Sequence, residues 1–94
     1  MHLVFSPAAL ADLDEIWDYT ADNWSIQQAD AYVDGVVAAC RDLAERRVVG
    51  RSVAIRQGYL KYVVGSHVIF YRESEGRLDI MRLLHRMMDF DRHL

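Results

Sequence analysis

Residues 77–94 read RLDIMRLLHRMMDFDRHL, and the first half of this segment has the composition of a buried strand. Five of the seven residues from Leu78 to Leu84 are apolar, which is typical of a strand covered on both faces. Arg82, His85 and Arg86 then place polar groups toward the end of that strand. We therefore expect the rest of the chain to support this strand, and its basic end to face a cleft.

The size and charge of the chain limit the classes of protein to which it can belong. Its 94 residues are the length of one domain, and 52% hydrophobic with 27% charged residues is ordinary globular composition. The formal net charge of −3 argues against a generic nucleic-acid binder. Residues 1–34 carry Asp and Glu but no Lys or Arg. This asymmetry predicts a bipolar surface, with an acidic helix on one side and a basic sheet on the other.

Nothing in the sequence indicates a cofactor, a metal centre or a membrane segment. Cys40 is the only cysteine, so there is neither an intrachain disulfide nor a cysteine metal cluster. The N-terminus lacks the pattern of a signal peptide, and no apolar run approaches the ~20 residues that span a bilayer. We expect a cytoplasmic protein.

The N-terminal third predicts a short strand followed by two helices. After the β-prone run Leu3–Phe5, Ser6 is a good N-cap and Pro7 suits the first helical position, so a helix should run to about Asp22. Its buried face would hold Leu10, Leu13, Ile16, Trp17 and Thr20, and its solvated face Asp12, Asp14, Glu15 and Asp18. Ser25 to Gln28 has the form of a capping box, which starts a second helix to roughly Arg46. The short connection predicts an antiparallel helical hairpin.

The C-terminal half predicts strands. Residues 47–57 form an irregular, arginine-rich loop with room for a short strand. Tyr59–Val64 and His67–Arg72 read as a hairpin closed by Gly65-Ser66, and residues 73–76 turn into the last strand from Arg77. Asp89–Leu94 forms either a last helical turn or a tail.

The order β-α-α-β-β-β predicts one α+β domain over residues 1–94, with the helical hairpin packed on one face of a mostly antiparallel, curled sheet. We expect the other face of the sheet to be partly open, which would invite a partner.

Four motifs, in this order, resemble the ParE toxins of ParD–ParE type II toxin–antitoxin modules, within the RelE/ParE superfamily. They are Ser6-Pro7-x-Ala9 with Asp12-Leu13-x-x-Ile16 and Tyr19, then Gly50-Arg51, then Gly65-x-x-Val68-Ile69-Phe70-Tyr71-Arg72, then Ile80-x-Arg82-Leu83-Leu84-His85-x-x-Met88-Asp89. The resemblance covers nearly the whole chain. It implies a bacterial toxin, encoded on a plasmid or chromosome and neutralised by a cognate ParD-like antitoxin encoded beside it.

The resemblance leaves two toxic activities open. ParE-type members are described as poisons of DNA gyrase, whereas RelE-type members cut mRNA on the ribosome, and both share this fold. Metal-independent RNA cleavage needs a proton acceptor, a cation for the phosphate and an acid, for which His85, Arg82 and Arg86 are the candidates. Ribonuclease members typically place an arginine where this chain has Val68, and some carry His-Tyr where it has His85-Arg86. These departures and the acidic net charge favour the gyrase-type toxin, with the endoribonuclease as the alternative.

The same residues can instead form partner-binding surfaces. The candidate basic surface comprises Arg51, Arg56, Arg72, Arg82, His85 and Arg86, extended by Met88 and Phe90. A groove for an amphipathic antitoxin helix would involve Leu10, Trp17, Tyr32 and Val36. Structural roles are also open: Arg82 could pair with Asp89 or with an acid of the first helix, His85 could be a hydrogen-bonded strand-end residue, and the other arginines could be solvated. A non-toxic adaptor domain is the third hypothesis.

Overall fold

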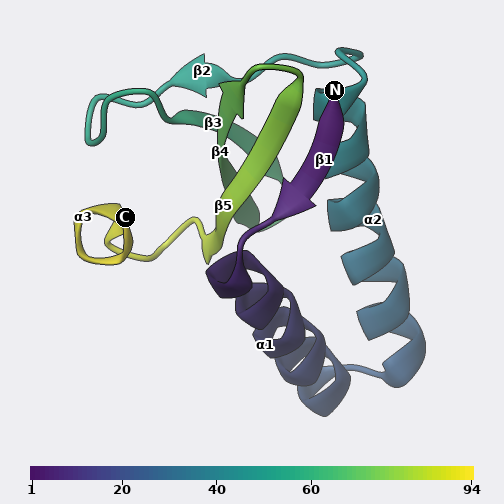
Figure 1. The fold of residues 1–94 in the computed structure, drawn as a ribbon. Helices are drawn as coiled ribbons and strands as arrows, with labels where there is room; N and C mark the ends of the chain where they lie inside the picture. The colour runs from purple at the N-terminus through teal and green to yellow at the C-terminus, as the bar shows by residue number, and fades with distance from the viewer.

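The computed structural model describes residues 1–94 as a five-stranded sheet, two long helices and a one-turn C-terminal helix (Figure 1). In chain order the elements are β1 (His2–Phe5), α1 (Pro7–Asn23), α2 (Ile26–Ala44), β2 (Arg51–Ser52), β3 (Leu60–Val64), β4 (His67–Ser74), β5 (Arg77–His85) and α3 (Phe90–His93). The predicted β-α-α-β-β-β order is confirmed, with a two-residue strand, β2, inside the predicted loop. None of the helices has the length and apolar character needed to cross a membrane.

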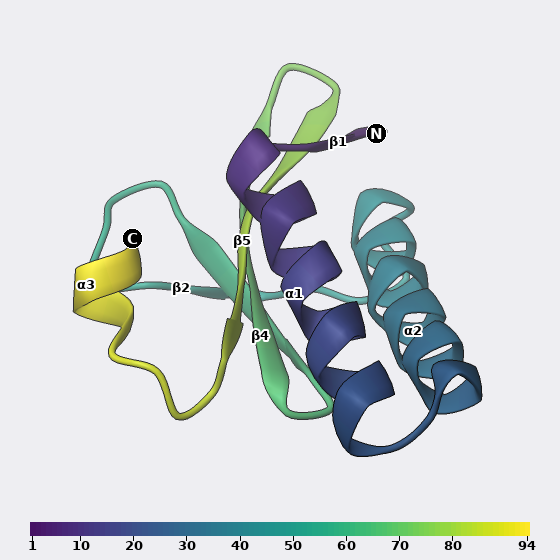
Figure 2. The ribbon, with the colours of Figure 1, turned by 90° about the horizontal axis from the view of Figure 1, so that it is seen from below.

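The sheet is mixed, with strand order β1-β5-β4-β3-β2. β1 pairs with β5 in parallel, and every other pair is antiparallel, as the predicted hairpins require. β5 therefore lies inside the sheet between β1 and β4, in agreement with its nearly continuous apolar sequence. Figure 2 shows three layers: α1 and α2 on one side of the sheet, and α3 with the loop before β3 on the other.

Side-chain caps set the starts of both long helices. The Ser6 hydroxyl accepts a hydrogen bond from the Ala9 N–H at 3.0 Å, and Pro7 occupies the first turn. The Ser25 hydroxyl accepts from the Gln28 N–H at 3.1 Å. α2 ends at Ala44, two residues before the predicted boundary, and Arg46 adopts a left-handed φ of 60° that is incompatible with helix.

The main core lies between the helices and one face of the sheet, and it corrects the predicted face of α1. The residues of α1 that are buried are Ala9, Asp12 and Ile16, whereas Leu10 is 52% exposed. A small residue such as Ala9 allows α1 to approach the sheet closely, which turns Leu10 toward solvent. Trp17 is only half-buried, and its indole N–H donates to Asp30 Oδ1 at 2.9 Å, linking α1 to α2.

The opposite face of the sheet is partly open, as predicted: the C-terminal segment covers one part of it, while Arg51 and Arg72 remain exposed. A second cluster of buried side chains there comprises Tyr59, Val68, Phe70 and Leu84. Phe90 and Leu94 of the C-terminal segment pack against it, and the Phe70 and Phe90 rings meet edge to face at 4.9 Å. Because Phe90 and Leu94 are four residues apart, one helical turn is enough to place both on the sheet.

A bulge in β5 joins α1 to the sheet. Phe70 of β4 pairs with Arg82 while Tyr71 pairs with Ile80, so the intervening Met81 has no partner on β4. Ser6 follows the last residue of β1 and bonds to this segment twice: its N–H donates to the Ile80 carbonyl at 2.9 Å and its hydroxyl to the Met81 carbonyl at 2.8 Å. The cap of α1 is thus fixed to the irregular part of β5.

One buried ion pair continues this connection. Arg82 Nε and Nη2 donate to Asp12 Oδ2 and Oδ1 at 2.8 and 2.9 Å, and the Leu83 N–H donates to the same Oδ2 at 2.8 Å. The expectation that Asp12 belongs to a solvated face is therefore wrong, because its carboxylate takes the place of a neighbouring strand for β5. Of the two predicted ion pairs for Arg82, the one with an acid of the first helix is confirmed.

Replacing Asp12 by Ala should lower the free energy of unfolding by about 3 kcal/mol, because it leaves a partly buried guanidinium and a buried N–H without their acceptor. Urea unfolding measures this loss. Asp14→Ala, on an exposed position of the same helix, should stay within about 0.5 kcal/mol of the wild type. The double variant Asp12→Leu, Arg82→Met should cost less than Asp12→Ala alone, because it removes both charges. Equal stability of Asp12→Ala and Asp14→Ala would contradict the proposed role of the pair.

Candidate functional site

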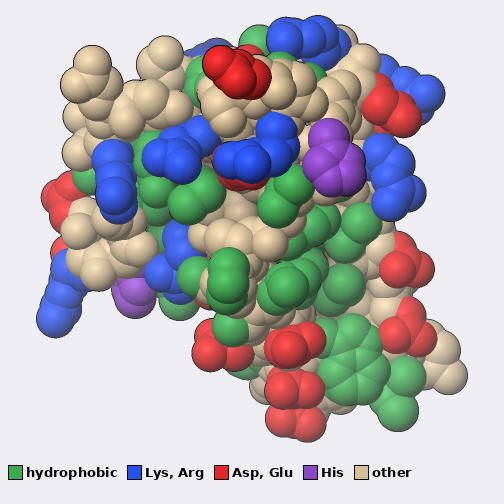
Figure 3. Space-filling view, in the orientation of Figure 1, with side chains coloured by type: hydrophobic (Ala, Val, Ile, Leu, Met, Phe, Trp, Pro, Cys, Tyr) green, Lys and Arg blue, Asp and Glu red, His purple; other side chains and the backbone are tan.

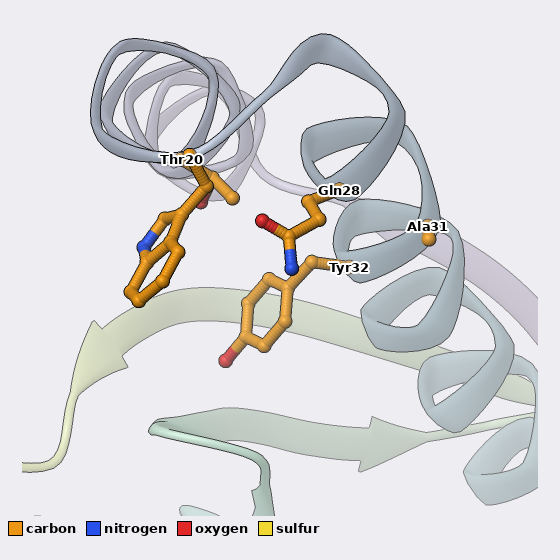
Figure 4. A pocket seen from close by; sticks show the side chains of 5 residues that line it. Thr20, Gln28, Ala31 and Tyr32 are labelled. Atoms are coloured by element: carbon orange, nitrogen blue, oxygen red, sulfur yellow. The ribbon is translucent and has the colours of Figure 1, made fainter.

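A cleft of about 920 Å³ lies between the C-terminal half of α1 and the ends of β4 and β5. The residues that line it are Asp12, Glu15, Ile16, Tyr19, Thr20, Trp24, Tyr32, Ser66, His67, Arg82, Leu83, His85, Met88 and His93. A second hollow of about 420 Å³ adjoins it, since Thr20, Trp24 and Tyr32 line both. Figure 4 shows Thr20 on α1 facing Gln28 and Tyr32 on α2, with the Tyr32 ring directed toward the strands. The two hollows form one groove along the helical hairpin.

The floor of the cleft is a hydrogen-bonded group of three aromatic rings. The Tyr32 hydroxyl lies 2.6 Å from His67 Nδ1 and accepts from the Ser66 N–H at 3.0 Å. The oxygen accepts from Ser66 and keeps its own proton, which it can donate to His67 Nδ1 in the tautomer that carries the imidazole proton on Nε2. The His67 and His85 rings meet edge to face, with centroids 5.3 Å apart. α2, the β3–β4 turn and β5 are thereby joined at one point.

The environment of His67 disfavours its charged form. Burial is the largest cause that lowers the pKa of His67 from its ordinary value, the neighbouring His85 lowers it further, and Asp12 opposes both. His85 accepts a hydrogen bond at Nδ1 from the Met87 N–H at 3.1 Å, so this predicted site residue also has a strand-end structural role. Both histidines present a ring to the cleft, and proton transfer is within their chemistry.

The arginine of the cleft is already engaged. Arg82 binds Asp12 with two of its nitrogens and donates from Nη1 to the His93 carbonyl at 2.9 Å. The hydrogen bonds that Arg82 donates to Asp12 are the largest cause that raises the pKa of Arg82, so it stays charged. Arg86, the other predicted phosphate ligand, is exposed and outside the lining of the cleft. Of the predicted trio, the structure brings His85 and Arg82 to the cleft and leaves Arg86 outside it.

The rim of the cleft is aromatic and exposed. Tyr19 is 68% and Trp24 is 71% exposed, at the tip of the helical hairpin, and Met88 is 43% exposed on the opposite side. Glu15 adds a carboxylate. Exposed large apolar groups beside a concave surface are typical of protein-binding sites rather than of small-molecule pockets.

The structure brings together only part of the predicted groove. Tyr32 lines the cleft, but Leu10 and Trp17 do not. Val36 is fully buried in the core, so the expectation that it lines an open groove is wrong. The apolar periodicity of α2 alone does not distinguish a residue under the sheet from one at its edge.

The other basic candidates lie away from the cleft. Arg56 and Arg72 hold their guanidinium carbons 5.0 and 5.8 Å from the centre of the Tyr59 ring, beside the cluster that α3 covers. Arg56 Nη1 also donates to the Leu94 carbonyl at 2.8 Å. Phe90 belongs to the same face, and Arg51 lies on the edge strand β2. The predicted basic surface is thus divided between two places.

Comparison with known proteins identifies the family. The sequence model of the family described as "ParE toxin of type II toxin-antitoxin system, parDE" matches residues 3–90. The chain belongs to the ParE toxin family. Toxin ParE1 of Mycobacterium tuberculosis is 45% identical over 93 residues, covering 97% of this chain and 95% of that protein. Toxin ParE1 of Caulobacter vibrioides is 39% identical over 90 residues, covering 95% and 93%. The protein is accordingly a toxin of a type II toxin–antitoxin system.

Solved structures share the fold of this ParE toxin. A chain of the chromosomal ParDE system from P. aeruginosa superposes with a TM-score of 0.81 at 21% identity, covering 90% of this chain and 95% of that one. The RelBE2 toxin–antitoxin complex from M. tuberculosis gives 0.66 at 21% identity, covering 90% and 96%. The YoeB/ParE toxin from Agrobacterium tumefaciens gives 0.61 at 19%, covering 92% and 99%.

Sequence reasoning missed His67, Tyr19 and Trp24 in this ParE toxin. His67 had a usable signal, because the Gly65-Ser66 turn fixes the hairpin register and a strand-end histidine on each of two adjacent strands brings the rings together. The structure also places Val68, the position at which ribonuclease members typically carry an arginine. Val68 is buried on the face that α3 covers, whereas its neighbour His67 faces the cleft.

The lowered pKa of His67 predicts that the toxin loses stability as the pH falls. Unfolded His67 takes up a proton near its ordinary value of about 6.5, whereas folded His67 does so only at a lower pH. The unfolded state therefore binds more protons between these two values, and the free energy of unfolding falls from about pH 7 downward until the folded pKa is passed. Urea unfolding at a series of pH values should show a shallower decline for His67→Gln than for the wild type. An imidazole NMR titration of His67 with its midpoint at or above 6.5 would contradict this account.

Proposed function

We propose that this ParE toxin poisons DNA gyrase through protein contacts, and that a ParD-like antitoxin neutralises it by placing an amphipathic helix in the cleft. The observation that supports this proposal best is the character of the cleft: its rim carries exposed Tyr19, Trp24 and Met88, and its one arginine is bound to Asp12. Such a surface suits a peptide better than a phosphodiester.

The shape of the groove suits a helix. It follows α1 and α2 from the strand ends to the tip of the hairpin, so a helix lying there could contact Tyr32 with one turn and Trp24 with another. Glu15 offers an ion pair to a basic residue on the polar side of such a helix. Antitoxin segments that fold upon binding are suited to long grooves, because a large contact surface offsets the conformational entropy that they lose on ordering. The ParDE system from P. aeruginosa and the RelBE2 complex share this fold in toxin–antitoxin assemblies.

Endoribonuclease activity has weaker support from the site. RNA cleavage needs a free cation at the crowded phosphate, and Arg82 is engaged with Asp12 and the His93 carbonyl. Asp12 and Glu15 add negative charge where the RNA backbone would lie. The His67–His85 pair could move a proton, but Arg82, the arginine of the same cleft, is held by Asp12 and is not free to position the substrate.

The C-terminal segment is our candidate for gyrase contact. Met87 is 82% and Met88 43% exposed, and Arg86 beside them is also exposed. Flexible thioether side chains suit adaptable protein interfaces. α3 fixes the end of this segment on the sheet through Phe90 and Leu94, so the methionines are presented by a supported loop rather than by a free tail.

Trp24→Ala should weaken binding of the antitoxin encoded beside the toxin by at least about 2 kcal/mol, or about 30-fold in Kd, because a rim tryptophan is a typical interface hot spot. Isothermal titration calorimetry measures this change. Val49→Ala removes an equally exposed apolar side chain outside the cleft and should change the Kd less than twofold. An unchanged Kd for Trp24→Ala would place the antitoxin elsewhere.

Purified toxin should inhibit DNA supercoiling by gyrase, and Met87→Glu should require at least about tenfold more toxin for half inhibition, since it places a charge in the proposed contact. Val49→Glu is the matched control, because it puts the same charge on another exposed apolar position and should inhibit like the wild type. Normal supercoiling at saturating wild-type toxin would refute the gyrase proposal. Inhibition that is equal for both variants would retain gyrase as the target but exclude Met87 from the contact.

A further inference from the structure

Three cations lie side by side on the β2–β3–β4 part of the sheet. Arg51 of β2 is directly opposite Lys61 of β3, and Lys61 is opposite Phe70 of β4. Arg72 follows Phe70 by two residues and so shares its face. Phe70 belongs to the cluster on the face away from α1 and α2, which places all three cations there. We call Arg51, Lys61 and Arg72 the cationic stripe.

The stripe has no internal neutralisation. The arginines that form ion pairs are Arg47, Arg77 and Arg82, so none of the stripe residues has an acidic partner. The acid opposite Arg72 is Asp79, which is buried and accepts from Arg77 Nε at 2.8 Å and Nη2 at 3.1 Å. Direct cross-strand pairing of like charges, as for Arg51 and Lys61, destabilises a sheet. A bound anion would remove that cost.

One member of the stripe, Arg72, is supported from beneath by an aromatic ring that it shares with the neighbouring Arg56. The Tyr59 ring is only 6% exposed, and the guanidinium groups of Arg56 and Arg72 lie against it at 5.0 and 5.8 Å from its centre. Such contacts limit the freedom of an arginine while its N–H groups remain available. Tyr59 itself is too buried to be an aromatic hot spot or a stacking platform. Arg72 is therefore a positioned positive charge on this surface.

The charge of the whole molecule would orient an approaching polyanion. Figure 3 shows Lys and Arg side chains gathered over the sheet half, and Asp and Glu around the free end of the helices. The net charge of −3 is a sum and does not show that positive and negative side chains are separated on the surface. A polyanion is repelled by the helical end and attracted by the sheet, which favours one docking direction.

We propose that the cationic stripe binds the phosphate backbone of duplex DNA. The choice of DNA over an acidic protein segment rests on the proposed function, since a gyrase poison acts beside DNA, and on the absence of an exposed aromatic hot spot in the stripe. The contacts are to phosphates, so binding is independent of base sequence. The stripe then holds the toxin on DNA while the separate cleft remains free.

Fluorescence anisotropy tests the inference on isolated toxin, without gyrase, using a labelled duplex of mixed sequence at 50 to 200 mM salt. Three phosphate contacts give a slope of log K against log salt near −2.7, that is, about 40-fold weaker binding over this range. The triple variant Arg51→Gln, Lys61→Gln, Arg72→Gln should flatten the slope by most of that amount and weaken binding at 50 mM at least about tenfold.

Arg41→Gln is the matched control, because it removes one exposed charge from α2 on the other side of the sheet and should bind DNA like the wild type. Thermal unfolding checks that the triple variant is folded. A triple variant with the wild-type slope, or wild-type toxin that binds poly-glutamate but not DNA, would overturn the inference. Loss of DNA binding together with intact inhibition of gyrase would support the stripe and show that gyrase recognition is separate from it.

Discussion

The bidentate pair of Asp12 and Arg82 is the contact on which the arrangement of this toxin depends. It joins residues 70 positions apart, and the same carboxylate accepts from the Leu83 N–H, so one side chain binds both the charge and the exposed edge of β5. Beyond the end of β1, the strand β5 would otherwise present unpaired N–H groups to solvent. Asp12 of α1 therefore accepts a hydrogen bond from the part of β5 that extends beyond its pairing with β1. This contact fixes both the position and the direction of the helical hairpin.

This fixation creates the cleft. The N-terminal turns of α1 are bound to β5 through Ser6 and Asp12, whereas Tyr19, Thr20 and Trp24 lie farther along, where the sheet has ended. The β3–β4 turn reaches the same region and bonds to α2 through Tyr32. The cleft is the concave surface that remains between α1, α2, the β3–β4 turn and β5. A buried ion pair of this kind contributes less to stability than to specificity of arrangement, since an apolar pair could fill the same volume.

The fold followed from local signals in the sequence, because each of them acts within a few residues. Ser6-Pro7, Ser25 and the Gly65-Ser66 turn set element boundaries that the structure confirms. The errors concern contacts made at long range. In the sequence, Asp12 looks like its exposed neighbours Asp14 and Glu15, and only the position of Arg82 distinguishes it. The far face is covered in part by Phe90 and Leu94, whose pattern is too short to show a helical period. The position of His67 in the cleft needed the pairing register as well as the residue type.

The C-terminal segment connects the cleft with the far face of the sheet, which are the two places where the basic residues lie. Met88 and His93 line the cleft, while Phe90 and Leu94 lie on the far face of the sheet beside Tyr59. Arg82 reaches the His93 carbonyl from the cleft, and Arg56 reaches the Leu94 carbonyl from the region of the cationic stripe. Under the proposed function, an antitoxin helix in the cleft would touch the same short segment that packs on the opposite face. The antitoxin would then not need to cover the far face, because the segment proposed to contact the target is already within its reach.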